Sequence, residues 1–364
     1  MSPPKVLHVV SAGELGGAER MLFDLVQHDT ESAHAVALYS PSEAIVQAFR
    51  ERVPELHVRR VRSEGPVAML ARAYGSAEAE WLERAWKSTA ANVLHLHTFG
   101  AQVVGARVGR AMRAPIVRTE HSTRVFDDPS CWALVRSTIE DARVSCSVSE
   151  AVRRVALDKA GARLRDARVV PNGVDVDTFS PLPRRSAARK RVALVGRIEP
   201  RKGVDIALEA LAPFQDLEID IVGDGPDAPA IRALARSLGM LGRTRFRGHV
   251  TDVHAALGEV DLVVSGARKE GLGLALLEAM AARRLVVATP TGGVPEFLQE
   301  GRTGFLAANG SKDALSRAVS RALAVPGATT EAILDRAATL VVSRFSVAAM
   351  CRAYAAIYRE LLAR

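Results

Sequence analysis

The sequence is poor in the features that mark disulfide-bonded, metal-binding and membrane-spanning proteins. It has three cysteines in 364 residues, and Cys131, Cys146 and Cys351 show no Cys-x-x-Cys spacing. Such an odd, sparse set argues against a disulfide framework and a zinc site, and it fits a reducing compartment. No apolar run approaches the roughly 20 residues needed to cross a bilayer, and the run at 6–11 is too short for a signal-peptide core. We therefore expect a cytoplasmic protein without a targeting segment.

Aromatic residues are also scarce, at 5% of the chain, and they form no aromatic-rich basic stripe typical of nucleic-acid binding. The net charge of +8 is unevenly distributed, with 23 Lys and Arg against 22 Asp and Glu in residues 1–181 and 26 against 19 in the remainder. A basic second half is expected of a protein that binds phosphates, although a solvated basic surface also explains it. The abundance of Arg and Ala is typical of a GC-rich bacterial genome.

The sequence is rich in short apolar runs that alternate with helical stretches. In the first half, strands are predicted at 6–11, 34–40, 93–98, 115–121 and 143–149, and helices at 18–27, 67–89, 101–112, 130–140 and 150–160. Ser149 is a good N-cap for the last of these helices. Residues 180–191 contain two prolines and a basic cluster without apolar periodicity, so they are interpreted as an interdomain linker.

The alternation restarts after the linker. Strands are predicted at 192–197, 217–223, 244–250, 261–266, 285–290 and 304–307, and helices at 203–212, 227–239, 252–258, 274–283, 294–299 and 311–324. The predicted fold is α/β, with two Rossmann-like domains whose parallel sheets face each other across a ligand-binding cleft. The expected domains are an N-terminal one (1–182), a C-terminal one (183–346) and an amphipathic helix (347–364) that packs back toward the first.

The segment KEGLGLALLEAMAA (269–282) carries the most chemistry. Its glycine turn leads into a helix that should start near Leu274 and place Glu278 about one turn inside. Unobstructed backbone N–H groups and the positive end of the helix dipole suit a diphosphate or a sugar oxygen. Glu270, at the strand end, can accept hydrogen bonds from sugar hydroxyls. The same pattern also fits a glycine turn followed by an ordinary acidic helix start.

Two further turns have phosphate-binding chemistry. In VGRIEPRKG (195–203), Arg197 and Lys202 follow a strand end, where a guanidinium and an ammonium group suit a diphosphate. In AGELGGAER (12–20), a glycine pair between the first strand and helix lets a ligand approach the backbone. The glycines do not follow G-x-G-x-x-G, so a dinucleotide-binding fingerprint is absent.

Together these stretches resemble the retaining glycosyltransferases of family 4 (glycosyl transferases group 1), which have the GT-B fold. The resemblance covers almost the whole chain, and its motifs occur in the family's order: GGAER (16–20), VVPNGVDVDTF (169–179), VGRIEPRKG (195–203), IVGDGPD (221–227), FRGHV (246–250), EGLGLALLEAMA (270–281) and TGGVPEFLQEGRTGFL (291–306). The chain departs from the family pattern in SGARKEG before the helix and at Arg283-Arg284. These departures concern the shape of the donor sugar and remove no charged contact.

The resemblance implies a role for each matching residue. Arg197 and Lys202 would neutralise the donor diphosphate, and Glu278 would hold the ribose hydroxyls. Glu270 would contact the hydroxyls of the donor sugar, and His121 would face the reacting sugar, so these two join Arg197 and Lys202 as the catalytic group. Backbone contacts near the sugar, the phosphates and the base would complete the donor site: Gly271, Leu272, Gly273, Leu274, Gly16, Gly17, Gly248, His249 and Val250.

Candidate acceptor ligands are His97, Glu120 and His121, which lie at neighbouring strand ends. His95 and His97 alternate on one strand face and could bind a metal, but the sequence shows no third ligand nearby. His8 is expected in the core, and His97 fits either the cleft or polar packing in the core.

The resemblance also implies the reaction. A hexosyl group would move from a UDP- or GDP-sugar to an acceptor hydroxyl with retention of anomeric configuration, by same-face attack with the leaving phosphate as base. Asp175-Val176-Asp177 looks like a D-x-D metal site, but it lies just before the linker, and the family handles phosphates with Arg and Lys. We therefore expect no metal and no other cofactor.

Other functions fit parts of the pattern: a sugar-nucleotide epimerase or hydrolase, a non-catalytic nucleotide-sugar-binding protein, or, from the pI alone, a nucleic-acid binder. The acceptor is expected to be a soluble small molecule or sugar, because the N-terminal half is nearly neutral and has only a small basic cluster at Arg59, Arg60 and Arg62. Peripheral membrane contact is compatible with the sequence. The donor sugar, the linkage and the oligomeric state are left open.

Overall fold

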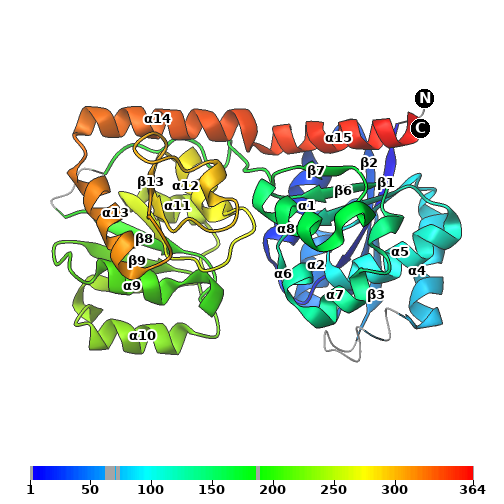
Figure 1. The fold of residues 1–364 in the computed structure, drawn as a ribbon, viewed down its shortest axis with the longest axis horizontal. Helices are drawn as coiled ribbons and strands as arrows, with labels where there is room; N and C mark the ends of the chain where they lie inside the picture. Colours follow the sequence, from blue (N-terminus) through cyan, green and yellow to red (C-terminus); the bar gives the residue numbers. More distant parts are fainter. Residues whose placement is uncertain (1–2, 62–69, 71–73, 186–188, 364) are drawn as a thin grey trace. The chain divides into compact units, whose positions relative to one another are not determined.

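The computed structural model describes residues 3–61, 70, 74–185 and 189–363. The chain divides into two compact units, of which unit 1 comprises Met1–Gly173 with Val347–Arg364, and unit 2 comprises Val174–Ser346 (Figure 1). Each unit is built on one parallel sheet, as the alternation predicts. Arg62, part of the predicted helix at 67–89 and part of the predicted linker lie outside the described residues. No helix among the described residues is long and apolar enough to span a bilayer.

Unit 1 contains a seven-stranded sheet in the order β3-β2-β1-β4-β5-β6-β7. Its strands are β1 (Lys5–Ser11), β2 (Ala33–Ser40), β3 (Leu56–Arg60), β4 (Val93–Leu96), β5 (Ile116–Glu120), β6 (Val144–Ser147) and β7 (Ala167–Val169). Its helices are α1 (Gly17–His28), α2 (Glu43–Arg50), α4 (Ser76–Thr89), α5 (Phe99–Met112), α6 (Arg124–Asp127), α7 (Pro129–Val135), α8 (Glu150–Ala160) and α15 (Val347–Ala363), with 3₁₀ turns η1 (Ile139–Asp141) and η2 (Gly161–Arg163).

The two faces of this sheet are covered by different helices, because successive side chains of a strand point to opposite faces. Leu7 and Val9 of β1 pack with α4 and α5, whereas Val6 packs with α1 and α15. Tyr354 and Tyr358 of α15 are fully buried in this second layer. The last helix of the chain therefore completes the core of unit 1.

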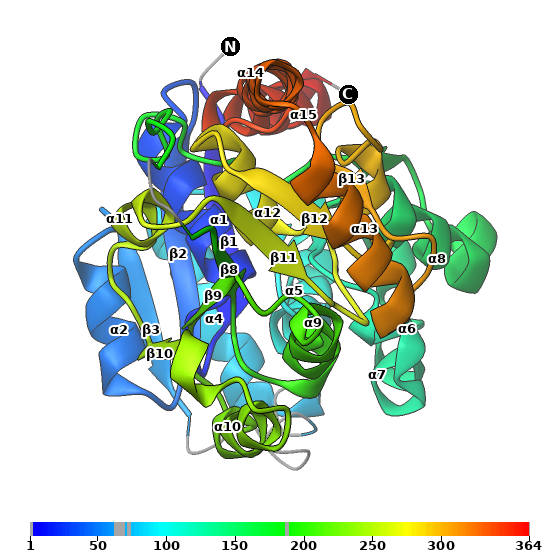
Figure 2. The same cartoon turned by 90° about the vertical axis from the view of Figure 1, so that its left-hand side faces the viewer.

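Unit 2 contains a six-stranded sheet in the order β10-β9-β8-β11-β12-β13. Its strands are β8 (Arg191–Val195), β9 (Glu218–Val222), β10 (Thr244–Gly248), β11 (Leu262–Ser265), β12 (Leu285–Ala288) and β13 (Phe305–Leu306). Its helices are α9 (Val204–Leu211), α10 (Ala228–Ser237), α11 (Val253–Gly258), α12 (Leu274–Ala281), α13 (Lys312–Ala324) and α14 (Gly327–Arg344), with η3 (Pro200–Lys202), η4 (Leu241–Arg243) and η5 (Val294–Glu296). Helices α9, α10 and α13 share one apolar core on a single face of the sheet (Figure 2).

The division between the units differs from the predicted boundary at 182/183. Residues after Gly173 contact unit 2: the Val174 amide donates to the Phe345 carbonyl at 2.7 Å, and the Leu182 amide donates to the Ala282 carbonyl at 3.3 Å. Backbone hydrogen bonds therefore bind the start of the predicted linker to the second sheet's domain. The segment after Ser346 belongs to unit 1, through α15.

Several elements were missed by the sequence pattern, among them the short helix α6 and the strand β7. Helix α2 and strand β3 lie between β2 and α4, and β3 is a half-buried edge strand with no clear alternation. Helix α14 extends for 18 residues and buries Ile333, Leu334 and Val341, but only Pro326 marks its start. The long predicted helix at 130–140 is instead the seven-residue α7 followed by the turn η1.

Candidate active site

The carboxyl end of β8 presents the two predicted cations. The strand ends at Val195, Gly196 follows with a φ of 141°, and Arg197 comes next. Lys202 closes the 3₁₀ turn η3, and Gly203 with a φ of 59° starts α9. A Cβ on Gly203 would meet the Gly266 carbonyl oxygen at 1.9 Å, so only glycine permits this close approach to the loop after β11.

Backbone hydrogen bonds join that turn to the loop that carries Glu270. The amides of Arg268 and Lys269 both donate to the Arg201 carbonyl oxygen, at 2.8 and 3.1 Å. The Arg268 guanidinium also bonds the Asp205 carboxylate at the start of α9. These contacts fix the loops after β8 and β11 relative to each other without any contribution from the side chains of Arg197, Lys202 or Glu270.

Lys202 and Glu270 meet at this junction. The Lys202 Nζ donates to Glu270 Oε2 at 2.6 Å, and their side chains are 24% and 15% exposed. Arg197 is more exposed, at 42%, and its Nε lies 3.7 Å from Glu199 Oε2. Arg197, Lys202 and Glu270 line one small pocket that is open to solvent, together with Gly273 and the end of β11. The structure thus brings together three of the four predicted catalytic residues.

Helix α12 begins at Leu274, as predicted, and its N-cap Gly273 has a φ of 104°. Gly292 packs against the backbone of Glu270, and the Gly293 amide donates to the Gly271 carbonyl at 3.1 Å, which holds the glycine turn in place. Glu278 lies one turn inside α12 and is 8% exposed. It does not line the cavity of Arg197, and Leu272 is buried at 3% exposure.

The remaining donor candidates of unit 2 lie at the end of β10, two strands from β8. Gly248 has a φ of 66°, and its carbonyl accepts from the Gly223 amide at 2.8 Å. His249 is exposed, and Val250 is half-buried. Because all six strands are parallel, these residues share the carboxyl edge of the sheet with Arg197.

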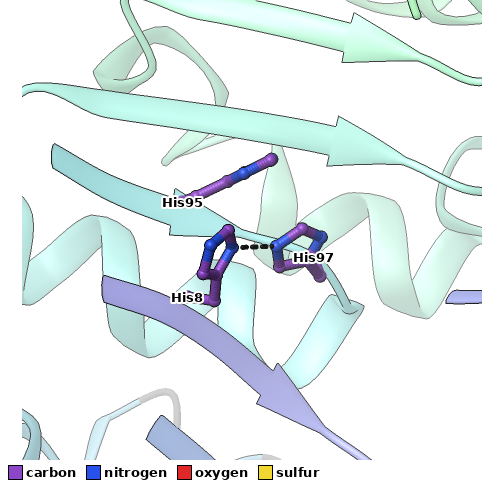
Figure 3. A group of neighbouring side chains, drawn as sticks. All are labelled: His8, His95 and His97. Atoms are coloured by element: carbon purple, nitrogen blue, oxygen red, sulfur yellow. Dashed lines mark hydrogen bonds between the residues drawn. The ribbon is translucent and has the colours of Figure 1, made fainter. Parts of the chain in front are cut away.

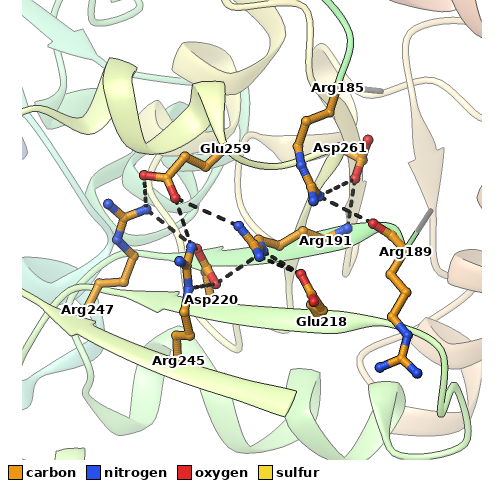
Figure 4. Close-up of polar contacts among 9 residues, drawn as sticks. All are labelled: Arg185, Arg189, Arg191, Glu218, Asp220, Arg245, Arg247, Glu259 and Asp261. Carbon is orange, nitrogen blue, oxygen red and sulfur yellow. Dashed lines mark hydrogen bonds and ion pairs between the residues drawn. The ribbon is translucent and has the colours of Figure 1, made fainter. Parts of the chain in front are cut away.

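Four arginines of unit 2 belong to an ion-pair network that does not line the cavity of Arg197. Arg191 and Glu218 are the first residues of β8 and β9, so they lie at the amino edge of the sheet. The fully buried Asp220 carboxylate is bonded by Arg245 and lies within 4 Å of Arg191 and Arg247 (Figure 4). The network also includes Arg185, Glu259 and Asp261. These arginines are therefore balanced by carboxylates, and they do not account for the net positive charge of the second half.

In unit 1 the predicted glycine pair lies at the start of α1. Gly16 is the N-cap, and its amide donates to the Glu19 Oε2 at 2.8 Å. Glu19 is 7% exposed, and burial raises the pKa of its carboxyl group. An anion that approaches Gly16 or Gly17 would therefore meet this carboxylate first. Sequence reasoning missed Glu19, although its position three residues after the N-cap is a known capping signal.

Histidines gather on the face of the sheet covered by α1 and α15. His8 Nδ1 lies 2.9 Å from His97 Nε2, and His95 lies beside them (Figure 3). The ligand atoms of His8, His95 and His97 lie within 4.8 Å of one another. The sequence-based statement that no third ligand lies near His95 and His97 was wrong, because β1 and β4 are paired with His8 opposite His95.

His121 follows β5 and continues this face. Its ring centroid lies 5.7 Å from that of His97, and burial lowers its pKa to about 4. Burial also lowers the pKa of His97 well below its ordinary value. Both rings are therefore neutral at pH 7. Among the described residues, no hydrogen-bond partner is found for His97 Nδ1 or for either nitrogen of His121.

Glu120 lies near these histidines in sequence but is engaged elsewhere. It is 2% exposed, and its carboxylate is bonded by the guanidinium of the equally buried Arg118. Arg118 in turn donates to the Gln102 side chain at 2.9 Å. The carboxylate is thus part of a buried ion pair in the core of unit 1.

Asp175, the first acid of the D-x-D sequence, stabilises a turn. Its carboxylate accepts from the amides of Asp177 and Thr178 at 3.1 Å and from the Thr178 hydroxyl at 2.5 Å. This is the geometry of a side chain that caps its own turn. It explains the acidic residue without a metal ion.

Comparisons with known proteins agree with the motifs. The model described as "Glycosyltransferase Family 4" matches residues 15–178, and that described as "Glycosyl transferases group 1" matches residues 189–325. The phosphatidyl-myo-inositol mannosyltransferase of Mycobacterium tuberculosis is 30% identical over 314 residues, which cover 80% of this chain and 78% of that protein. Its namesake from Mycobacterium leprae is 33% identical over 241 residues, or 63% of each chain.

The fold agrees with the same family. The structure of HepE from Anabaena in complex with UDP and glucose has a TM-score of 0.82 with 21% identity, and the match covers 98% of this chain and 100% of that one. Two parallel-sheet units with this likeness confirm the predicted GT-B fold. The chain therefore belongs to glycosyltransferase family 4, the glycosyl transferases group 1.

Proposed function

We propose that this glycosyltransferase moves a hexosyl group from a UDP- or GDP-sugar to an acceptor hydroxyl, with retention of the anomeric configuration. The observation that carries the proposal is the convergence of Arg197, Lys202 and Glu270 on one cavity at the carboxyl ends of β8 and β11. The names of the mycobacterial relatives, which are mannosyltransferases, and the UDP and glucose bound to HepE support a hexosyl donor.

The donor diphosphate would be held by Arg197 and Lys202. A lysine ammonium group has three donor hydrogens, so Lys202 can keep its bond to Glu270 and also donate to a phosphate oxygen. Glu270 uses Oε2 for that bond, which leaves Oε1 to accept from a hydroxyl of the sugar. The Lys202–Glu270 pair would therefore set the distance between the phosphate and the sugar. Glu278 is proposed to hold the ribose.

The chemical step leaves a diphosphate anion, and stabilising that charge is the main catalytic task. Arg197, Lys202 and the N-terminus of α12 are preorganised donors for it. The acceptor hydroxyl would attack from the face that the phosphate leaves and transfer its proton to the departing phosphate oxygen. The neutral rings of His97 and His121 would contribute hydrogen bonds to substrate hydroxyls.

No divalent cation takes part in this proposal. Two cationic side chains lie in the cavity, and the Asp175 carboxylate already accepts three hydrogen bonds within its turn. Turnover should therefore persist in excess EDTA. Loss of turnover in EDTA with recovery on addition of Mg²⁺ or Mn²⁺ would contradict the proposal.

The acceptor is proposed to be a soluble small molecule or sugar. Arg59 is paired with Glu78 and Arg60 with Glu43, so these two described members of the basic cluster offer little unpaired charge to an anionic membrane. Sedimentation with anionic vesicles at physiological salt would oppose this assignment. It would favour a lipid acceptor such as the names of the mycobacterial relatives indicate.

A donor panel tests the function as a whole. UDP- and GDP-sugars at 100 times their Kd should stabilise the protein by about 2.7 kcal/mol, which is readily seen as a thermal shift. The stabilising donor is then incubated with acceptor candidates, and the anomeric configuration of the product is read by NMR. Donor consumption without any acceptor would indicate an epimerase or hydrolase, and binding without consumption would indicate a non-catalytic binding protein.

A further inference from the structure

A buried chain of hydrogen bonds runs through unit 1 from the end of α1 to the end of β4. Asp29 Oδ2 lies 3.1 Å from His34 Nε2, His34 Nδ1 lies 2.9 Å from His8 Nε2, and His8 Nδ1 lies 2.9 Å from His97 Nε2. The last link is drawn in Figure 3. All four residues are buried, with exposures of 0% to 9%. Asp29, His34, His8 and His97 are here called the histidine relay.

The relay is a product of strand pairing. Strand β1 pairs with β2 and β4, and its residue His8 lies on the face that packs against α1 and α15. His95 lies on the same face but outside the relay, because its two nitrogens are bonded to the Tyr358 hydroxyl at 2.7 Å and the Thr119 hydroxyl at 2.8 Å. Both nitrogens of His95 therefore have partners, one from α15 and one from β5, whereas the relay ends at the carboxylate of Asp29.

An ionised carboxylate can only accept hydrogen bonds, and it fixes which nitrogen of each ring carries the proton. His34 must donate from Nε2 to Asp29, so in the neutral ring its Nδ1 accepts from His8 Nε2–H. His8 Nδ1 then accepts from His97 Nε2–H. At the end of this series of hydrogen bonds, His97 Nδ1 carries no proton and has a lone pair that can accept a hydrogen bond.

The opposite direction is less favourable. It would require a charged imidazolium at His34, and it would end in a buried N–H at His97 Nδ1, which has no partner among the described residues. Buried donors without a partner are rarer in proteins than buried acceptors without one. Burial also lowers the pKa of both His8 and His97, which favours neutral rings.

We propose that Asp29, His34 and His8 are positioning residues that hold His97 with an unprotonated Nδ1, as a hydrogen-bond acceptor for a hydroxyl of the sugar acceptor. The inference rests on the proposed function for the identity of the ligand, but not for the direction of the relay. Three neighbouring ring nitrogens, His97 Nδ1 and both of His121, lack partners among the described residues. Buried polar atoms require partners, and a polyhydroxylated ligand supplies them.

A metal ion is the alternative use of the same residues, since His8, His95 and His97 could surround one. Coordination would break the His8–His97 hydrogen bond and at least one of the two bonds made by His95. The hydrogen bonds therefore favour the relay, and the experiment below includes the metal as an outcome that would overturn it.

The direct test is the tautomer of each ring, read by ¹⁵N NMR of the full-length protein, with His97→Gln and His8→Gln used to assign the signals. In the wild type, His97 should be protonated at Nε2 and not at Nδ1. Asp29→Asn keeps the shape and retains an oxygen that can accept from the Glu31 amide. Its NH₂ group can donate to His34, which would reverse the relay and move the His97 proton to Nδ1. A similar Asp→Asn change in a Ser-His-Asp triad acts through the wrong tautomer.

The functional readout separates the acceptor from the donor. Asp29→Asn should lower kcat/KM for the acceptor by about tenfold or more and leave the donor-induced thermal shift unchanged. Asp24→Asn, which removes one charge from the same helix outside the relay, should match the wild type. If Asp29→Asn does not fold, His34→Gln interrupts the same relay and should have the same effect on the acceptor.

Three results would overturn the inference. These are a wild-type His97 protonated at Nδ1, an Asp29→Asn variant with unchanged tautomers and kinetics, or a stoichiometric metal in the purified protein that is lost in His8→Gln. If the protein transfers no sugar at all, the proposed function fails, and the wild-type tautomers still decide whether the relay exists.

Discussion

The carboxyl edges of the two sheets differ in how they present polar groups. In unit 2, Arg197 and Lys202 are charged and partly exposed, at 42% and 24%. In unit 1, His97 is neutral and 2% exposed. Charged groups that bind and release a diphosphate would need access to solvent. A neutral imidazole costs less to bury than a charged group, although its nitrogens still require hydrogen-bond partners. The difference is the one expected for the diphosphate and hydroxyl ligands proposed for the two edges.

An ion pair between a basic residue and a glutamate near the edge of each unit shows the same contrast. The Arg118–Glu120 pair of unit 1 is almost fully buried, at 1% and 3% side-chain exposure. The Lys202–Glu270 pair of unit 2 is partly open to the cavity. We infer that the first pair maintains the fold and the second serves the ligand.

The largest expected effect tests that contrast through stability. Glu120→Ala leaves the Arg118 guanidinium buried without its partner and should cost about 3–5 kcal/mol of unfolding free energy. Glu270→Ala should cost much less and abolish donor turnover. Urea unfolding followed by far-UV circular dichroism, which reports both units, measures both losses. The fluorescence of Trp81, Trp86 and Trp132, which all belong to unit 1, assigns the loss in Glu120→Ala to that unit.

A double variant provides the control for this comparison. Arg118→Met with Glu120→Leu removes both buried charges and should recover most of the stability lost in Glu120→Ala. Equal losses for Glu120→Ala and Glu270→Ala would show that the two pairs do not differ in the way proposed.

The next largest effect concerns the charged edge of unit 2. Arg197→Ala removes one preorganised donor to the leaving diphosphate and should lower kcat by about 10²-fold. Arg201→Ala is the matched control, because Arg201 lies in the same turn but its side chain binds Glu199 at 2.6 Å. Steady-state kinetics measures kcat for both variants, and Arg201→Ala should remain close to the wild type. A kcat near the wild-type value for Arg197→Ala would show that Arg197 has no role in the chemical step.

The sequence predicted the charged edge better than the neutral one, for a physical reason. Arg197 and Lys202 follow one strand and Glu270 follows another, and the carboxyl ends of parallel strands meet at one edge. The start of α12 at Leu274 and the Ser149 cap of α8 are also confirmed, because they depend on residues close in sequence. Local patterns were sufficient for these features.

The histidine relay could not be predicted from local sequence patterns. The links of the relay depend on the register between β1, β2 and β4. The hydrogen bond that keeps the neighbouring His95 outside the relay joins it to Tyr358, 263 positions away in the sequence. Alternation shows that His8 and His95 occupy buried strands but not which side chains meet across them. Arg118 and Glu120 are two positions apart in the predicted strand, so alternation places them on one face, but it does not show that this face is buried or that the two side chains pair.

A change in pH should affect the two units differently. Burial lowers the pKa of His121 to about 4 and those of His8, His95 and His97 well below their ordinary value near 6.5. The unfolded chain therefore binds more protons than the folded one below about pH 6.5, and the stability of unit 1 should fall as the pH is lowered toward 4. The depressed carboxyl pKa values of Asp205 and Glu259 in unit 2 act only at lower pH.

Urea unfolding of unit 1, followed by tryptophan fluorescence at pH 7.5, 6.5 and 5.5, measures this effect. The midpoint should fall with decreasing pH, and His121→Gln should reduce the fall because it removes one of the titrating groups. A midpoint that is independent of pH over this range would contradict the lowered pKa values, because the histidines would then bind protons equally in the folded and unfolded protein.

The smallest expected effect is at the glycine pair of α1, where a carboxylate occupies the position of an anion. Glu19 accepts from the Gly16 amide, and its charge would oppose a donor phosphate that approached Gly16 or Gly17. Glu19→Gln keeps an accepting oxygen and removes the charge, so the donor should bind about 2- to 5-fold more tightly if the phosphate lies there, as expected for 0.3–1 kcal/mol at a helix N-terminus. Isothermal titration with the UDP- or GDP-sugar measures the change, and Glu43→Gln, at the start of α2, controls for the loss of one surface charge. An unchanged Kd would place the phosphates on Arg197 and Lys202 alone, and the charged and neutral edges would then be separate in function as well as in composition.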